Sequence, residues 1–150
     1  MKRLRIYIDT SVVGGCFDEE FAKESLALMQ AARDGRIVLI VSNALLDELD
    51  PAPPRVQEIL DGLPAGATES VSATEESERL REAYLRSQVV GPASTRDAHH
   101  IALATVHRAD LLVSWNFKHI VHWDKIRKFN AVNLEEGYPP IEIRSPQEVI

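Results

Sequence analysis

The chain has 150 residues, of which 45% are hydrophobic and 27% are charged, a composition typical of one soluble globular domain. Its formal net charge of −6 argues against a protein that coats nucleic acid through many Lys and Arg contacts with phosphates. The single cysteine, Cys16, excludes an internal disulfide. The sequence shows neither a signal-peptide core nor an apolar run of membrane length. We therefore expect one domain over residues 1–150, located in the cytoplasm, with no membrane partner.

The first half of the chain alternates between strand-like and helix-like segments. Short runs of branched and aromatic residues predict strands, and longer runs with apolar residues at helical spacing predict helices. In chain order we expect a strand at residues 4–8, a helix at 18–34, a strand at 37–41, helices at 44–49 and 55–60, and a weak strand at 68–71. Gly14 and Gly15 predict a break in the chain after the first strand, and Gly35 predicts a helix stop.

The second half continues this alternation. It predicts a charged helix at residues 74–89, a helix at 95–108, a strand at 111–114, a further strand at 131–134 and a small terminal strand at 141–143. Strands that alternate with helices imply right-handed crossovers and an α/β fold. We therefore expect a mainly parallel sheet of about five strands with helices on both faces. Ligands bind such sheets at the carboxyl ends of the strands, so polar residues there are the candidates for a site.

Acidic and polar residues follow the predicted strands at that edge. Asp9 ends the first strand, Glu48 lies on the helix after the second, and Asp97 opens a later helix. Ser114 and Asn116 follow the fourth strand. Converging carboxylates oppose folding unless a cation lies between them, and Mg²⁺ prefers hard oxygen ligands together with substrate phosphates. The pattern therefore favours metal-assisted hydrolysis of a nucleic-acid backbone.

Four segments, in this order, resemble the motifs of PIN-domain nucleases. They are residues 6–11 around Asp9, 45–49 around Glu48, 96–102 around Asp97 and 114–117 around Asn116. The resemblance spans about residues 4–134. It implies a three-layer α/β/α fold and ribonuclease activity that depends on Mg²⁺ or Mn²⁺. Because it extends to VapC-type toxins, it also implies an RNA substrate, an antitoxin protein as partner and a homodimer.

Our leading hypothesis is therefore a divalent-metal-dependent endoribonuclease that serves as the toxin of a type II toxin–antitoxin system. The expected metal ligands and catalytic residues are Asp9, Glu48, Asp97 and Asn116, with Ser11 and Ser114 in support. Many relatives have Asp at the position of Asn116. Because an amide oxygen brings no negative charge, we expect weaker metal binding here.

Each acid also has a structural interpretation. Asp9 can begin an Asx turn, Asp97 fits a capping box that starts at Ser94, and Glu48 can be a solvated surface acid. The serines can bond to backbone. The five histidines lack cysteine or acid partners at zinc spacing, so we interpret them as surface or substrate-side residues.

The residues around Asn116 leave two interpretations open. Trp115 and Phe117 either anchor the core or, for one of them, stack on a base. A modest basic stretch follows, which either grips phosphates or forms a solvated helix face; its members are Lys118, Lys125, Arg127 and Lys128.

Two other functions compete with the leading hypothesis. One is a PIN-like binding module with a degenerate, weakly active or inactive metal site, which Asn116 and the acidic balance favour. The other is a phosphotransfer enzyme with Asp9 as nucleophile, as in haloacid-dehalogenase-like phosphatases. Those enzymes place a second Asp two residues later, where this chain has Ser11.

Overall fold

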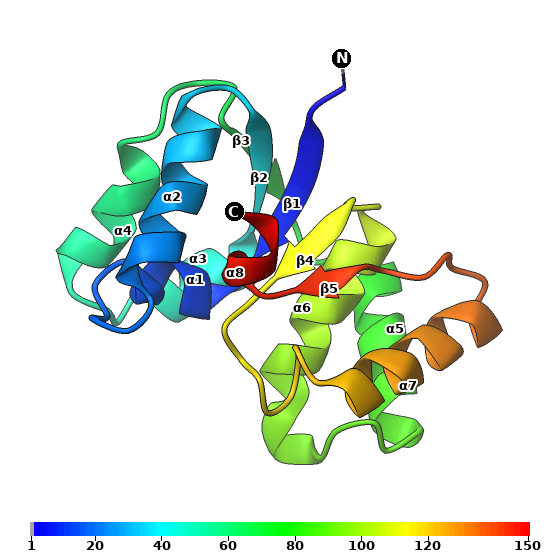
Figure 1. The fold of residues 1–150 in the computed structure, drawn as a ribbon. Coiled ribbons are helices and arrows are strands. Elements are labelled where there is room, and N and C mark those ends of the chain that lie inside the picture. The colour runs from blue at the N-terminus through cyan, green and yellow to red at the C-terminus, as the bar shows by residue number, and fades with distance from the viewer. Residues whose placement is uncertain (1) are drawn as a thin grey trace.

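The computed structural model describes residues 2–150 (Figure 1). Its strands are β1 (Leu4–Ile8), β2 (Ile37–Ser42), β3 (Thr68–Val71), β4 (Leu111–Val113) and β5 (Ile143–Arg144). Its helices are α1 (Thr10–Gly15), α2 (Ala22–Arg33), α3 (Asn43–Leu49), α4 (Pro54–Asp61), α5 (Glu75–Arg86), the 3-10 helix η1 (Pro92–Ser94), α6 (Thr95–Val106), α7 (Trp123–Glu135) and α8 (Pro146–Val149). Within the described residues, no helix is both long enough and apolar enough to cross a membrane.

The five strands form one sheet in the order β3-β2-β1-β4-β5, and every neighbouring pair is parallel. The strand β1 lies at the centre, where Tyr7 is in register with Ile40 of β2 and with Leu112 of β4. The predicted parallel sheet is thus confirmed. Because all carboxyl ends lie at one edge, the residues that follow β1, β2 and β4 meet there.

Helices cover both faces of the sheet (Figure 1). The side chains of β1 point alternately to these two faces. Ile6 and Ile8 point to one face and pack with apolar residues of α1, α2, α3 and α4. Tyr7, between them in sequence, points to the other face and packs with α5, α6 and α7. Successive side chains of a strand point to opposite faces, so one buried strand anchors two cores. This confirms the predicted three-layer α/β/α arrangement.

The strand predicted at residues 131–134 is wrong, because these residues belong to the helix α7. Ile126, Phe129 and Val132 recur every three residues along α7 and pack against the sheet, which is the pattern of a helix with one buried face. A four-residue apolar run cannot by itself distinguish a strand from part of a helix. The fifth strand of the sheet is β5, which overlaps the small terminal strand predicted at residues 141–143.

The break predicted at Gly14 and Gly15 is also wrong, since both residues lie in α1. Gly15 is needed for packing: a Cβ there would lie 2.6 Å from Ser25 Oγ and 2.9 Å from Trp115 Nε1. The helix stop at Gly35 is confirmed, because α2 ends two residues earlier and Gly35 has a φ of +78°.

Candidate active site

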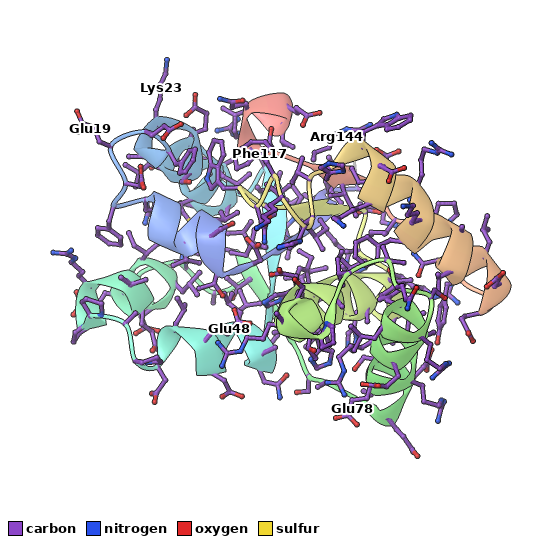
Figure 2. All side chains as sticks on the ribbon, turned by 90° about the horizontal axis from the view of Figure 1, so that it is seen from below. Glu19, Lys23, Glu48, Glu78, Phe117 and Arg144 are labelled. Atoms are coloured by element: carbon purple, nitrogen blue, oxygen red, sulfur yellow. The ribbon has the colours of Figure 1, made fainter. Side chains whose placement is uncertain are left out.

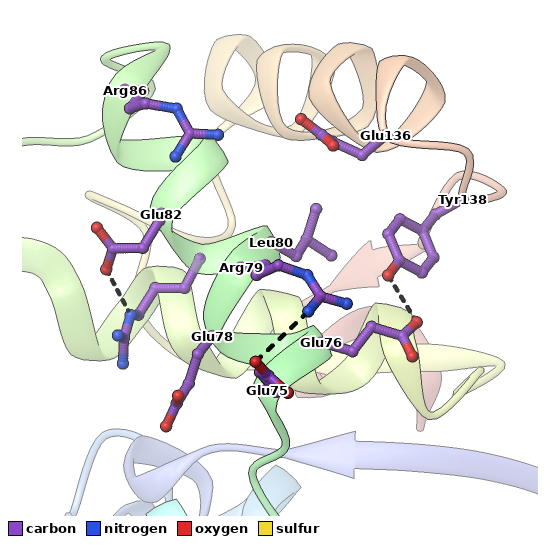
Figure 3. A pocket seen from close by; sticks show the side chains of 10 residues that line it. Glu75, Glu76, Glu78, Arg79, Leu80, Glu82, Arg86, Glu136 and Tyr138 are labelled. Carbon is purple, nitrogen blue, oxygen red and sulfur yellow. Dashed lines mark hydrogen bonds and ion pairs between the residues drawn. The ribbon is translucent and has the colours of Figure 1, made fainter.

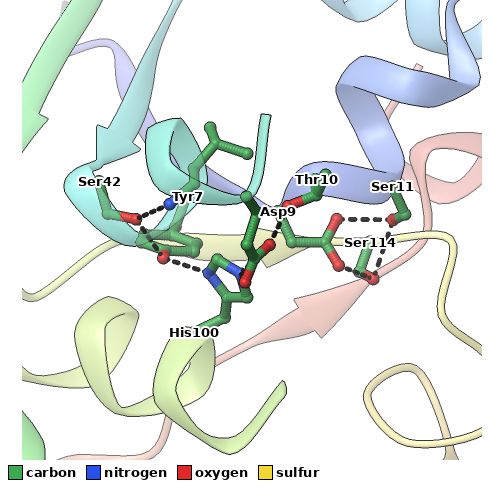
Figure 4. A network of polar contacts seen from close by, with 9 residues as sticks. Tyr7, Asp9, Thr10, Ser11, Ser42, His100 and Ser114 are labelled. Atoms are coloured by element: carbon green, nitrogen blue, oxygen red, sulfur yellow. Dashed lines mark hydrogen bonds and ion pairs between the residues drawn. The ribbon is translucent and has the colours of Figure 1, made fainter. Parts of the chain in front are cut away.

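Asp9 follows β1 and is only 4% exposed. Ser11 Oγ donates a hydrogen bond to Asp9 Oδ1 at 2.6 Å, and Ser114 Oγ donates to Asp9 Oδ2 at 2.6 Å (Figure 4). Burial raises the pKa of Asp9, while the charge of His100 and the two serine hydroxyls oppose that rise. Both carboxylate oxygens are therefore held in a fixed orientation by the two serines that the sequence predicted as supporting residues.

Each of these serines is itself fixed by the loop after β4. Ser11 Oγ accepts a hydrogen bond from the backbone N–H of Trp115 at 2.9 Å, and Ser114 Oγ accepts one from the N–H of Asn116 at 2.9 Å. The hydroxyl proton of each serine is then free to point at Asp9. The loop after β4 thus sets the position of an acid that lies more than 100 residues earlier in the chain.

Glu48 lies on α3, half-buried at the same edge of the sheet. Figure 2 views this edge and places Glu48 between the cyan ribbon of α3 and the green ribbon of α6. Its carboxylate accepts a hydrogen bond from Thr10 Oγ1 and lies 2.9 Å from His100 Nε2. Burial alone would raise the pKa of Glu48, but the hydrogen bond and charge of His100, together with Thr10, lower it overall. Glu48 is therefore an ionised, oriented acid and not a solvated surface residue.

His100 is the functional candidate that sequence reasoning missed. It is 2% exposed, so its interpretation as a surface or substrate-side histidine is wrong. Its Nδ1 lies 2.6 Å from Tyr7 Oη, which in turn lies 2.8 Å from Ser42 Oγ (Figure 4). His100 follows Asp97 by three residues, which places both on one face of α6. That spacing was the available signal.

Asp97 lies in the first turn of α6 and is half-buried. Among the described residues, the Ser94 side chain makes no capping hydrogen bond, so the predicted capping box is not formed. Burial raises the pKa of Asp97, and the negative charge of Glu48 adds to that rise. The charges of His119 and His100 oppose it. Asp97 thus lies within electrostatic reach of Glu48 and two histidines.

The charge of His100 acts on the pKa of all three acids, Asp9, Glu48 and Asp97. His100 contacts Glu48 directly, with Nε2 2.9 Å from the carboxylate. The three acids come from three separate elements, which lie at one edge because the parallel sheet aligns its carboxyl ends.

Asn116 also lies close to this cluster. Its Oδ1 accepts a hydrogen bond from the backbone N–H of His119 at 2.9 Å. Its side chain also lowers the pKa of Asp97, which places the amide near that acid. The amide oxygen thus closes a turn, and the role of Asn116 as a metal ligand stays a prediction.

No protein-family model matches the sequence, and neither does any curated protein. Among solved structures, a chain from the VapBC2 complex of Rickettsia felis, bound to a DNA fragment from its promoter, is similar with a TM-score of 0.57. The two chains are 14% identical, and the match covers 95% of this chain and 98% of that chain. The chain has a PIN-like fold. A sequence identity this low supports a shared fold alone. The match includes nearly the whole length of both chains.

The PIN-like fold places hard oxygen donors at its acidic edge, and these suit a magnesium or manganese ion. Across residues 2–150, no group of three or more His, Cys, Asp or Glu side chains could hold a metal ion as a protein cage. Mg²⁺, however, is commonly held by one or two carboxylates and takes its other ligands from water and phosphate. The donor set at this edge therefore fits an ion that is shared with substrate.

Two grooves border the acids in the PIN-like fold. One, of about 200 Å³, is lined by Glu48, Arg96 and His99 with two neighbours. The other, of about 410 Å³, is lined by Ser11, Gly14, Gly15, Asp18, Phe21, Trp115 and Asn116. The first groove contains Glu48 itself, and the second reaches Asp9 through Ser11, which donates a hydrogen bond to it.

A larger groove of about 550 Å³ lies elsewhere, over α5 and the end of α7 (Figure 3). Part of its lining is engaged in contacts: Arg79 pairs with Glu75, Arg81 pairs with Glu82, and Tyr138 Oη donates to Glu76 at 2.6 Å. Because Asp9, Glu48 and Asp97 all lie at another place, we do not assign the site there.

The two aromatic residues beside Asn116 differ in role. Trp115 is 5% exposed and belongs to the core, whereas Phe117 is 47% exposed. Much of the basic stretch is occupied by other contacts: Lys125 Nζ donates to Val89 O at 3.1 Å, and Lys128 pairs with Asp124 at 2.9 Å. A solvated helix face describes most of that stretch.

Proposed function

We propose that this chain is a divalent-metal-dependent ribonuclease that acts as the toxin of a toxin–antitoxin pair. The observation that carries the proposal is the placement of Asp9, Glu48 and Asp97 at the carboxyl edge of the parallel sheet, where neighbouring side chains fix the first two by hydrogen bonds. The PIN-like fold supports it, as does the fold similarity to a chain of VapBC2. RNA is the proposed substrate, a second polypeptide the proposed antitoxin, and a homodimer the proposed assembly.

The acids would differ in their tasks. Asp9 and Glu48 each accept hydrogen bonds from two side chains, which fix their orientation before substrate arrives. Asp97, which is half-buried in the first turn of α6, would offer its oxygens to a metal. Mg²⁺ or Mn²⁺, when bound, would acidify a water and neutralise charge on the phosphate oxygens. Because the two acids are already oriented, the reaction would not have to supply the entropy cost of ordering them.

The decisive test compares isosteric variants on single-stranded RNA with Mg²⁺ or Mn²⁺. We expect the parent to cleave, and Asp9→Asn and Asp97→Asn to lose cleavage while keeping the native circular dichroism spectrum. Asp47→Asn removes an exposed acid from α3 and serves as the matched control. Cleavage that survives EDTA, or that survives Asp97→Asn, would contradict the proposed mechanism.

A second candidate is a PIN-like binding module with an inactive metal site. The specific observation in its favour is that both oxygens of Asp9 already have protein donors, as does Glu48. Its signature would be tight binding of an antitoxin without cleavage of RNA at any Mg²⁺ or Mn²⁺ concentration. A phosphotransfer role for Asp9 is disfavoured, because a carboxylate that is 4% exposed has little access to a phosphate.

A further inference from the structure

We propose that the groove of about 410 Å³ beside Asp9 binds one unpaired guanine base of the RNA, next to the phosphate that is cut. The proposal rests on the proposed ribonuclease function and adds a base preference to it. We refer to this feature as the base groove; its lining residues are those given above, from Ser11 to Asn116.

The base groove is continuous with the acidic site through two residues. Ser11 lines the groove and donates a hydrogen bond to Asp9 at 2.6 Å. Asn116 lines the groove and donates its backbone N–H to Ser114 Oγ at 2.9 Å, and Ser114 in turn donates to Asp9. A phosphate held at the acids would therefore place a neighbouring base at the mouth of the groove.

One wall of the base groove is aromatic and rigid. The rings of Trp115 and Phe21 stack with centroids 4.3 Å apart and planes inclined by 23°. Trp115 Nε1 donates to Ser25 Oγ at 2.8 Å, and its backbone N–H donates to Ser11 Oγ at 2.9 Å. Proteins that recognise single-stranded RNA hold splayed-out bases against such fixed aromatic surfaces.

The space in the base groove exists because Gly14 has no side chain. Apart from its two neighbours in the chain and the backbone of α1, no atom of residues 2–150 lies within 4 Å of a Cβ built on Gly14, so this position faces open space. The groove also lies within the size range of small-molecule pockets, roughly 300–1,000 Å³. A side chain at Gly14 would therefore occupy the groove without striking the fold.

The carboxylate of Asp18, which lines the base groove, would select among bases. Asp18 Oδ1 accepts a hydrogen bond from the backbone N–H of Glu20 at 2.8 Å, which orients its carboxylate. Guanine presents two adjacent donors on its Watson–Crick edge, the N1–H and the N2 amino group, which match the two oxygens of a carboxylate. Uracil offers one donor flanked by acceptors, which a carboxylate repels. Asp18 therefore favours guanine.

An arginine side chain from a protein partner has a similar donor pattern, but the continuity with the acids and the width of the groove favour a base. The test is a metal-free titration followed by ¹⁵N–¹H NMR, with guanosine 5′-monophosphate, uridine 5′-monophosphate and arginine amide as separate probes. We expect guanosine 5′-monophosphate to shift the Trp115 indole and the Gly14 and Gly15 amides. We expect uridine 5′-monophosphate to bind at least about tenfold more weakly.

Two variants and a control test the assignment. Gly14→Leu fills the base groove and Asp18→Asn removes its carboxylate; each should weaken binding of guanosine 5′-monophosphate by about tenfold. Ala65→Leu introduces the same side chain at an exposed position before β3, at the opposite edge of the sheet, and should bind like the parent. Because Asp18 is exposed, its substitution tests the proposal even where Gly14→Leu fails to fold.

Three outcomes would overturn the proposal: no shift at Gly14 or Trp115, binding in Gly14→Leu equal to the parent, or a stronger response to arginine amide than to the nucleotide. Failure of the proposed function looks different. Guanosine 5′-monophosphate that binds in the groove of a protein that cuts no RNA supports the base groove and contradicts the nuclease. A parent that cuts RNA before or after guanine, with a Gly14→Leu variant that cuts at unchanged positions and rates, contradicts the base groove alone.

Discussion

His100 Nε2 lies 2.9 Å from Glu48 Oε1, a contact that joins α6 to α3 across the carboxyl edge of the sheet. The other ring nitrogen of His100 lies 2.6 Å from Tyr7 Oη on the central strand. One buried imidazole thus connects the two helices to β1, so its removal affects both the stability of the fold and the position of Glu48.

We predict that His100→Ala lowers the free energy of unfolding by about 2–4 kcal/mol, because it leaves a cavity and removes one hydrogen-bond partner each from Tyr7 and Glu48. Urea denaturation measures the loss. His99→Ala is the matched control: His99 is half-buried and its contact to Ser77 Oγ is long, at 3.4 Å. Equal losses for the two variants would show that the contacts of His100 contribute nothing specific.

Asp97→Asn should make the metal-free protein more stable at neutral pH. Burial and the charge of Glu48 raise the pKa of Asp97 in the folded state, so folding favours its protonated form. The parent therefore loses stability as the pH rises from the ordinary Asp pKa of about 3.9 through the higher folded value. The advantage of Asp97→Asn should be full above that window and vanish below it.

Urea denaturation of the parent and of Asp97→Asn between pH 3 and pH 8 tests whether the variant is more stable at neutral pH and equally stable at low pH. Asp47→Asn, the exposed control, should stay within about 0.5 kcal/mol of the parent. A variant that is less stable than the parent at neutral pH would show that the Asp97 carboxylate stabilises the fold. Higher stability together with lost cleavage would mark Asp97 as a residue kept for function.

Asn116→Asp should tighten binding of Mg²⁺ and Mn²⁺, because it adds a negative charge beside Asp97 while keeping an oxygen that accepts the N–H of His119. Isothermal titration with each ion measures the change. Asn43→Asp is the control, since Asn43 Oδ1 also accepts a backbone N–H, that of Ala73, at 2.9 Å. If only the control gains affinity, or neither variant does, Asn116 lies outside the metal site.

The adjacent glycines of α1 should respond in opposite directions to alanine. Gly15→Ala should lower the free energy of unfolding by about 1–3 kcal/mol, because its Cβ would strike Ser25 Oγ and the Trp115 indole. Gly14→Ala should raise it by about 0.5–1 kcal/mol, since its Cβ meets open space and alanine favours a helix. Thermal and urea denaturation of the pair will show whether α1 is packed as described.

The fold was largely predictable because its strands are short, branched runs flanked by strong helix signals. The strand β2 has such a run, and its two-sided burial follows from its place inside the sheet. Residues 131–134 were wrongly predicted as a strand because Val132 is branched. The helix becomes evident only from the three-residue spacing of Ile126, Phe129 and Val132. The two-residue strand β5 overlaps the strand predicted at 141–143 by one residue, because its bounds are set by pairing with β4 and not by the local pattern.

The site was predictable in part. Asp9, Glu48 and Asp97 follow strands or open helices, so topology alone brings them to one edge. The place of His100 was not predictable from its neighbour His99, because which of two adjacent histidines is buried depends on the rotation of α6 against the sheet. The base groove was also hidden, since it depends on the absence of a side chain at Gly14 and on the contact between Phe21 and Trp115.

The pairing of Asp9 with Ser114 has a consequence for the timing of activity. The two residues are 105 positions apart in the chain, and Ser114 becomes available only after β4 has been made. Contacts between such distant segments form late, because a long stretch of chain must be ordered first. A growing polypeptide would therefore carry Asp9 through most of its synthesis without its serine partner, and the proposed nuclease site would stay incomplete until Ser114, at position 114 of 150, had left the ribosome.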